Sequence, residues 1–175
     1  QAALASVQES FSKEQEYYDV NVKGTENIFK LAKDLDFKVV YASSSSIYGN
    51  PEKIPINEND KKNPINPYAV TKLDDENLAI KYAKMGVQII GLRYFNVFGE
   101  KQSSTYAGVI KKFVKKVRNN EAPIINGDGE QTRDFVYVGD VVNANILAMN
   151  SDVDHEFFNI GTATTITILE LANLI

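Results

Sequence analysis

Tyr68 and Lys72, a tyrosine and a lysine four residues apart, are of the types and spacing that proton transfer requires. Asn66 is a favourable helix N-cap and Pro67 a favourable first helical residue, so a helix is predicted to begin here and to place the phenol and the ammonium on one face. A tyrosine ordinarily titrates near pH ~10, and a neighbouring positive charge stabilises its phenolate. We therefore predict that Tyr68 acts as a general base supported by Lys72.

A tyrosine and a lysine at this spacing also occur on many surface helices, where the ring only covers the lysine stem. The preceding stretch strengthens the chemical interpretation. The apolar segment from Lys38 ends in four serines, residues 43–46, which is typical of a buried parallel strand that delivers hydroxyls to the ligand-binding edge of an open α/β sheet. A hydroxyl of Ser44 or Ser45 is predicted to hydrogen-bond a substrate oxygen and to help pass its proton.

Composition and charge exclude several classes of protein. The 175 residues are 43% hydrophobic and 24% charged, which is ordinary for a globular protein with a core. A net charge of −4, with no basic block that goes beyond short pairs such as 111–112 and 115–116, argues against a nucleic-acid partner. The sequence has no cysteine, so disulfides and cysteine metal sites are excluded. Without a run of ~20 apolar residues or a basic signal segment, we expect a cytoplasmic protein with no membrane partner.

The first 99 residues alternate between helical and strand patterns, which predicts an α/β fold. The predicted elements are a helix at 14–33, the serine-ended strand from 38, a functional loop at 50–66, a helix at 67–85 ended by Gly86, and a strand at 87–94. Asn21 lies near the buried face of the first helix and is a candidate ligand contact.

From residue 100 onward the pattern becomes irregular and predicts a small lobe over the carboxyl edge of the sheet. Its predicted elements are a helix at 106–119, a strand at 123–126, a turn at 127–129, a strand at 135–138, a helix at 139–149, a strand and turn at 157–161, and a last helix capped by Thr167. His155 is predicted to be a surface residue, since it has no partner at metal-ligand spacing, and no metal site is expected.

Four motifs in order carry a resemblance to a known family. They are Y-A-S-S-S-S-I-Y-G at 41–49, N-P-Y-A-V-T-K at 66–72, L-R-Y-F-N-V-F-G at 92–99 and G-D-G-E-Q-T-R-D-F-V-Y-V-G-D-V at 127–141. Together they resemble the extended short-chain dehydrogenase/reductase family, in particular its NAD-dependent nucleotide-sugar epimerases and dehydratases. Within that group the sequence is most similar to the UDP-glucose and UDP-N-acetylglucosamine 4-epimerases.

The resemblance implies a Rossmann-type doubly wound parallel sheet with a small substrate-binding lobe. Residues 1–99 would be the C-terminal part of the NAD-binding domain, and residues 100–175 mostly the nucleotide-sugar lobe, interleaved with the last sheet elements. The family's N-terminal glycine-rich unit, which cradles the cofactor pyrophosphate, has no counterpart in these residues. We therefore expect a fragment that is inactive by itself.

The resemblance also implies roles for individual residues. Catalytic roles fall on Ser44, Tyr68 and Lys72. Contacts to the cofactor NAD fall on Ala2, Ala3, Asn21, Ala42, Ser43, Tyr68, Lys72, Tyr94 and Phe95. Contacts to the UDP-sugar substrate fall on Ser44, Ser45, Asn96, Val109, Ile125, Asn126 and Arg133.

Some substrate positions depart from the family pattern or allow a second interpretation. The family often has proline at the position of Lys111 and an aromatic residue at that of Asn126. The guanidinium of Arg133 suits a phosphate. Spacing alone instead favours a surface ion pair of Arg133 with one of the acidic residues Asp128, Glu130 and Asp134.

The implied reaction is 4-epimerisation by transient oxidation. Tyr68 takes the proton of the sugar 4-hydroxyl, NAD⁺ accepts and returns the hydride, and a 4-keto sugar turns over in between. A 4,6-dehydratase commonly carries an acidic residue directly after the active-site serine or threonine, where this chain has Ser45 and Ser46. A UDP-glucuronate 4-epimerase commonly has threonine at the position of Asn96. A non-catalytic dinucleotide-binding regulator is an alternative of another class, and a homodimer through the two helices flanking the serine strand is expected.

Overall fold

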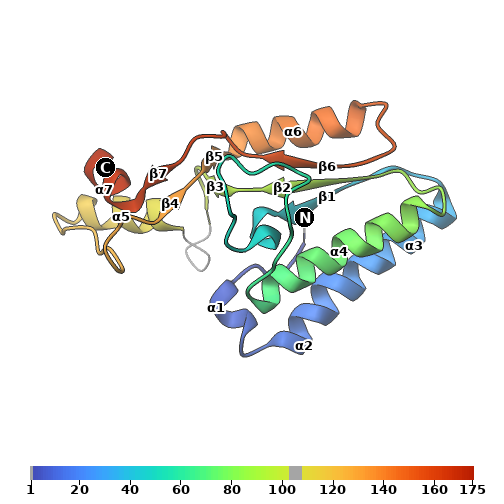
Figure 1. Cartoon of the computed structure of the whole chain (residues 1–175), viewed down its shortest axis with the longest axis horizontal. Helices are drawn as coiled ribbons and strands as arrows, with labels where there is room; N and C mark the ends of the chain where they lie inside the picture. The colour runs from blue at the N-terminus through green and yellow to red at the C-terminus, as the bar shows by residue number, and fades with distance from the viewer. Residues whose placement is uncertain (1, 103–107) are drawn as a thin grey trace.

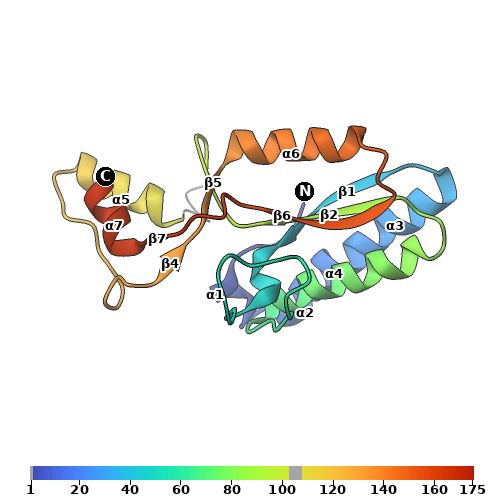
Figure 2. The same cartoon turned by 45° about the horizontal axis from the view of Figure 1, so that its top comes forward.

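A computed structural model describes residues 2–102 and 108–175 and shows a three-layer α/β arrangement. Three parallel strands form the main sheet in the order β1-β2-β6. Helices α3 and α4 cover one face of this sheet and α6 covers the other (Figure 1, Figure 2). The bounds are β1 Val39–Ser44, β2 Ile89–Tyr94, β6 His155–Ile160, α3 Gly24–Leu35, α4 Pro67–Ala83 and α6 Val138–Asn150. The predicted Rossmann-type fold class is confirmed.

The register of the sheet brings its polar strand ends together. Ser44 of β1 pairs with Tyr94 of β2, which pairs with Ile160 of β6. Because all three strands are parallel, their carboxyl ends meet at one edge, where open α/β sheets place their ligands.

Apolar packing on both faces of β2 holds the layers together. On the α3 and α4 side, Phe29, Tyr41 and Tyr82 form a buried aromatic group with Ile89. On the α6 side, Leu92 of β2 belongs to a second buried cluster. A strand buried on both faces needs a continuous apolar sequence rather than an alternating one, which explains the predicted buried strand at 87–94. No helix of the described residues is long and apolar enough to cross a membrane.

The predicted first helix is a continuous helical run that contains a π-helical segment. It consists of α2 Glu14–Tyr17, the π segment η1 Tyr18–Lys23 and α3. The wider turn changes the rotation of the helix and buries Asn21, which is 1% exposed. A short helix, α1 Val7–Ser10, precedes this run.

Helix α4 begins as predicted. The Asn66 side chain accepts a hydrogen bond from the Ala69 N–H at 2.9 Å, and Pro67 occupies the first turn. Helix α4 ends at Ala83, and Gly86 follows with φ +92°, the left-handed conformation expected after a helix.

The small lobe is built from short strands and two helices that lie beyond the carboxyl edge of the main sheet (Figure 1). Its core contains Phe113, Ile168 and Leu171. Thr167 caps the last helix as predicted, in a reciprocal capping box with Glu170. The elements are β3 Asn96–Phe98 paired with β5 Phe135–Tyr137, β4 Thr132–Arg133 paired with β7 Ile166–Thr167, α5 Val109–Arg118 and α7 Ile168–Leu174. The predicted division of the chain between residues 99 and 100 stays a prediction.

Three local predictions need correction. The strand predicted at 123–126 is wrong: residues 121–125 have no regular structure, since Pro123 lacks a backbone donor and no strand of the described residues pairs with this segment. The predicted helix at 106–119 is observed from Val109, and residues 106–107 lie outside the described part. His155 is half-buried at the start of β6, with Nδ1 3.0 Å from the Ile89 carbonyl, rather than on the surface.

Candidate active site

A cleft of about 1150 Å³, here called the main cleft, lies at the carboxyl ends of β1 and β2. It is closed by the loop after β1 and by the first turns of α4. Most of the residues predicted from the sequence to act in catalysis or cofactor binding line this one space. They are Ala3, Ala42, Ser43, Ser44, Tyr68, Lys72, Tyr94 and Phe95, and the predicted substrate contact Ser45 lines it as well.

The serine run forms a turn rather than a continued strand. The Ser44 side chain accepts a hydrogen bond from the Ser46 N–H at 3.2 Å and so caps the short 3₁₀ helix η2, Ser45–Tyr48. Because an acceptor contact leaves the hydroxyl proton free, Ser44 can still donate to a ligand. The Ser43 hydroxyl is not free to donate to a ligand, since it donates to Glu76 Oε1 at 2.7 Å.

Tyr68 and Lys72 lie one turn apart on α4, and both line the main cleft. Within residues 2–102 and 108–175 the Tyr68 hydroxyl makes no hydrogen bond, so it is available to a ligand. The Lys72 ammonium donates to the Ala42 carbonyl at 3.1 Å and to Asp75 Oδ2 at 3.1 Å. An ammonium has three donors, so one remains for a bound molecule.

Asp75 is the buried anionic partner of Lys72. Its side chain is 0% exposed and that of Lys72 is 6% exposed. Burial raises the pKa of the Asp75 carboxyl from its ordinary value of 3.8 to about 6, and the neighbouring ammonium opposes this rise. The carboxyl is therefore ionised at neutral pH and forms a buried ion pair with Lys72.

A second buried ion pair, between Arg93 and Glu76, also contacts the serine turn. Arg93 of β2 binds both carboxylate oxygens of Glu76 on α4, at 2.8 Å each. Its remaining nitrogen donates to the Tyr48 hydroxyl at 2.7 Å and to the Glu58 carbonyl at 2.8 Å. One guanidinium thus joins the sheet, the catalytic helix, the serine turn and the loop that borders the main cleft.

The loop at 50–66 is held over the cleft by Asn159 at the end of β6. The backbone N–H of Asn159 donates to Glu58 Oε1 at 2.9 Å, and the side-chain amide of Asn159 donates to the Ile56 carbonyl at 2.9 Å. At the start of the loop Gly49 has φ +62°, and a Cβ there would lie 2.0 Å from the Asn63 carbonyl oxygen. Only glycine therefore allows the two ends of this loop to approach so closely.

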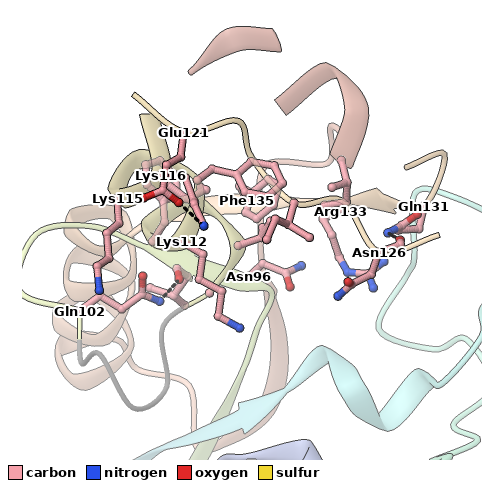
Figure 3. A pocket seen from close by; sticks show the side chains of 18 of the residues that line it. Asn96, Gln102, Lys112, Lys115, Lys116, Glu121, Asn126, Gln131, Arg133 and Phe135 are labelled. Atoms are coloured by element: carbon pink, nitrogen blue, oxygen red, sulfur yellow. Dashed lines mark hydrogen bonds and ion pairs between the residues drawn. The ribbon is translucent and has the colours of Figure 1, made fainter. Parts of the chain in front are cut away.

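A cavity of about 780 Å³, here called the lobe cavity, adjoins the main cleft at Asn96 and Arg133, which line both spaces. Figure 3 shows Arg133 and Asn126 on one side and the lysines of α5 on the other. Its lining contains the cations Lys112, Lys115, Lys116 and Arg133 and, among the described residues, the single carboxylate of Glu121, which pairs with Lys116. This excess of positive charge suits an anionic group of a ligand.

Arg133 does not form the surface ion pair that its sequence spacing favours with a described acidic residue. Within the described residues no carboxylate lies within 4.0 Å of its guanidinium, which donates instead to the Thr132 carbonyl at 2.7 Å. Asp134 is committed elsewhere, because its carboxylate accepts from the backbone N–H groups of Thr162 and Ala163. The remaining donors of Arg133 are available between the two cavities.

The predicted substrate contacts are divided between the two spaces. The lobe cavity is lined by Asn96, Val109, Asn126 and Arg133, but not by Ile125, which packs into the core of the lobe. Contacts of all these residues with a ligand stay predictions.

Two residues predicted to contact the cofactor do not line the main cleft. Asn21 holds the backbone of Leu4, with its Oδ1 2.9 Å from the Leu4 N–H and its Nδ2 3.0 Å from the Leu4 carbonyl. The Asn21 amide also donates to Thr71 Oγ1 at 3.0 Å and so anchors the first residues against α4. Ala2 lies in that anchored segment and is exposed.

Sequence reasoning missed the residues that support the site rather than form its surface. A supporting role of Arg93 could have been predicted from the sequence, since a charged residue inside an apolar strand must find a buried partner. Glu76 follows Lys72 by four residues and so lies one turn further along α4. Asn159 carried no signal, because the loop that it holds is distant in sequence.

The chain is similar to known proteins in both sequence and structure. Residues 1–161 match the NAD dependent epimerase/dehydratase family. The structure superposes with a TM-score of 0.95 and 38% identity on UDP-N-acetylglucosamine 4-epimerase from Methanobrevibacter ruminantium M1, in complex with UDP-N-acetylmuramic acid, covering 99% of this chain and 57% of that one. UDP-glucose 4-epimerase from Thermotoga maritima, solved with UDP-glucose, gives a TM-score of 0.94 at 34% identity, covering 99% and 58%.

The chain is also similar to relatives with another activity. UDP-N-acetyl-alpha-D-glucosaminuronate decarboxylase of Bacillus cytotoxicus is 36% identical in an alignment that covers 98% of this chain and 55% of the relative. The chain thus spans little more than half the length of the relatives it matches. The family match covers most of the chain and confirms the resemblance carried by the four motifs. The chain belongs to the NAD dependent epimerase/dehydratase family.

Proposed function

We propose that the protein containing this chain is an NAD-dependent 4-epimerase of a UDP-sugar, either UDP-glucose or UDP-N-acetylglucosamine. One observation carries the proposal: Ser44, Tyr68 and Lys72 line a single cleft that adjoins a cation-lined cavity. The cleft supplies the groups for proton transfer, and the cavity supplies positive charge for a diphosphate.

The residues of the main cleft fit the nicotinamide end of NAD. Ala3, Ala42 and Phe95 offer apolar surface, and Lys72 has a donor free for a ribose hydroxyl. The chemistry that this cofactor would supply there is reversible acceptance of a hydride from the sugar carbon. We propose that the predicted cofactor contacts that line the main cleft, without Ala2 and Asn21, are the residues that hold it.

The chain's own residues move the proton. Tyr68, as phenolate, accepts the proton of the sugar hydroxyl and later returns it. Lys72 stabilises the phenolate by its positive charge. Ser44 donates a hydrogen bond to the same sugar oxygen, where charge changes during the reaction. Arg133, between the two spaces, is placed to bind the diphosphate.

Loss of water or of carbon dioxide from the sugar is the second candidate, favoured by the similarity to a decarboxylase. Elimination of water needs an additional acid. The carboxylates that line the described part of the main cleft are Glu58 and Asp134, and backbone N–H groups occupy both. This commitment of the two carboxylates supports epimerisation over dehydration.

The test uses the protein at its full encoded length with NAD⁺ and, separately, UDP-glucose and UDP-N-acetylglucosamine. We expect conversion to the galacto isomer, followed by proton NMR of the anomeric signals. A product that has lost water or carbon dioxide would replace the proposal by the second candidate, and NAD⁺ binding without any turnover would favour a regulator. Titration calorimetry of the 175-residue chain with NAD⁺, alongside an epimerase assay, tests the expectation that it is inactive alone, and micromolar binding or measurable turnover would contradict it.

Replacing Ser44 and Ser45 separately by alanine tests the serine assignment. We expect Ser44→Ala to lower kcat by about 10²-fold and Ser45→Ala by much less, since Ser44 is assigned the proton-transfer hydrogen bond. Ser44→Thr keeps the hydroxyl and should recover part of the activity, which separates this role from the cap on η2. If steady-state kinetics shows a larger loss of kcat in Ser45→Ala than in Ser44→Ala, the assignment of the two serines is wrong.

A further inference from the structure

The ion pair between Lys72 and Asp75 is not explained by binding of cofactor or substrate alone. Asp75 lies on the far side of the lysine from Tyr68, three residues further along α4. It is fully buried and does not line either cavity. A carboxylate in this position costs desolvation energy, so its effect must reach the site through the lysine that it contacts.

The contacts show two effects of Asp75 on Lys72. The ammonium is fixed from two sides, by the Ala42 carbonyl and by Asp75 Oδ2. As a neighbouring anion, Asp75 also offsets the positive charge of the ammonium. Tyr68 and Asp75 are seven residues apart on one helix, which is roughly 10 Å along its axis.

Other charged groups around Asp75 are engaged or more exposed. On α4, Glu76 is paired with Arg93 from β2, and Asp74 is half-buried. From the neighbouring elements, the Tyr41 phenol of β1 and the Thr25 hydroxyl of α3 face the carboxyl. Burial raises the pKa of Tyr41 well above 10, so that this phenol is neutral. Asp75 is therefore the anion that sets the net charge at Lys72.

We propose that Asp75 is a positioning residue of the reaction, which holds the Lys72 ammonium at the main cleft and reduces the effect of its charge on Tyr68. This inference rests on the proposed role of Tyr68 as the base. Since the pKa of Asp75 is about 6, the carboxyl is mostly ionised at pH 7, so the compensation is present at neutral pH.

Asp75→Asn separates the charge from the anchoring, because the amide oxygen still accepts a hydrogen bond from Lys72. Loss of the negative charge favours the Tyr68 phenolate. The ascending limb of kcat against pH should therefore move to lower pH by about one unit, as expected for a unit charge at roughly 10 Å in an effective dielectric of about 20. Asp74→Asn removes the same charge one residue away and is the matched control, with an expected shift below about 0.3 unit, since solvent screens it.

Three outcomes would overturn the proposal. The ascending limb of kcat against pH could stay in place in Asp75→Asn, it could move to higher pH, or it could move equally far in Asp74→Asn. Asp75→Ala, which loses the acceptor as well, should lower kcat in addition to moving the limb. If Asp75→Asn does not fold, Asp75→Ser is the smaller uncharged variant that keeps an acceptor. Failure of both to fold at pH 7 would show that the carboxylate serves folding, and the proposal would be wrong.

A measurement without turnover distinguishes this inference from the proposed function. Because the pKa of Asp75 is raised to about 6 in the fold, its protonation stabilises the folded state fully below pH ~4, and this stability is lost as the pH rises through about 6. The melting temperature of the wild type should therefore fall between pH 4.5 and 7 by about 5 °C more than that of Asp75→Asn. Equal pH dependence would contradict the buried pair even if the enzyme is an epimerase. Absent turnover with this difference intact would contradict the proposed function, and with it the positioning role, but would leave the buried pair standing.

Discussion

Replacement of Tyr68 by phenylalanine is expected to reduce the kcat of epimerisation by about 10³-fold or more, in the protein at its full encoded length. A positioned general base contributes about 10²–10⁴-fold. Phenylalanine has the same ring and lacks only the hydroxyl, so the sugar proton has no acceptor in its place. Steady-state kinetics measures this loss, which corresponds to about 4 kcal/mol of transition-state stabilisation.

The same variant should keep its fold and its affinity for NAD⁺. Within the described residues the Tyr68 hydroxyl has no hydrogen-bond partner, so its removal leaves no buried group unpaired. Thermal unfolding and NAD⁺ titration are the controls. If more than about a tenth of wild-type kcat remains, a loss of less than ~1.4 kcal/mol, Tyr68 is not the base.

Replacement of Arg93 by methionine is expected to destabilise the fold by about 3–5 kcal/mol, because it leaves the Glu76 carboxylate buried without its cation. Arg93 is 1% exposed and Glu76 is 2% exposed, so water cannot take the place of the guanidinium. The Tyr48 hydroxyl and the Glu58 carbonyl lose a donor as well. The free energy of unfolding in urea measures the effect.

Two further variants identify the cause of this loss. Arg93→Met combined with Glu76→Leu removes both charges, and it should recover at least about 1 kcal/mol, since an apolar pair often replaces a buried ion pair with little cost. Lys23→Met breaks the exposed pair with Asp19 and should change stability by less than about 1 kcal/mol. A loss below about 1 kcal/mol in Arg93→Met would show that the buried network does not hold the layers together.

Local sequence determined much of the fold and the candidate catalytic residues. The N-cap Asn66 and Pro67 place the start of α4 and hence the spacing of Tyr68 and Lys72. The apolar runs before Ser43 and through Leu92 become the buried parallel strands β1 and β2. These features depend on capping and hydrophobic periodicity, which act over a few residues and are therefore visible in the chain itself.

Tertiary structure alone decided which partners the polar groups have. Asn21 was a predicted cofactor contact, yet a π-helical segment turns its amide toward Leu4 and Thr71. Arg133 has no ion pair with its acidic neighbours in sequence within the described residues, because Asp134 binds the turn after β6. Hydrogen bonds and ion pairs between segments that are distant in sequence leave no local periodicity, so the support that Arg93 and Asn159 give to the site could only be found in the folded chain.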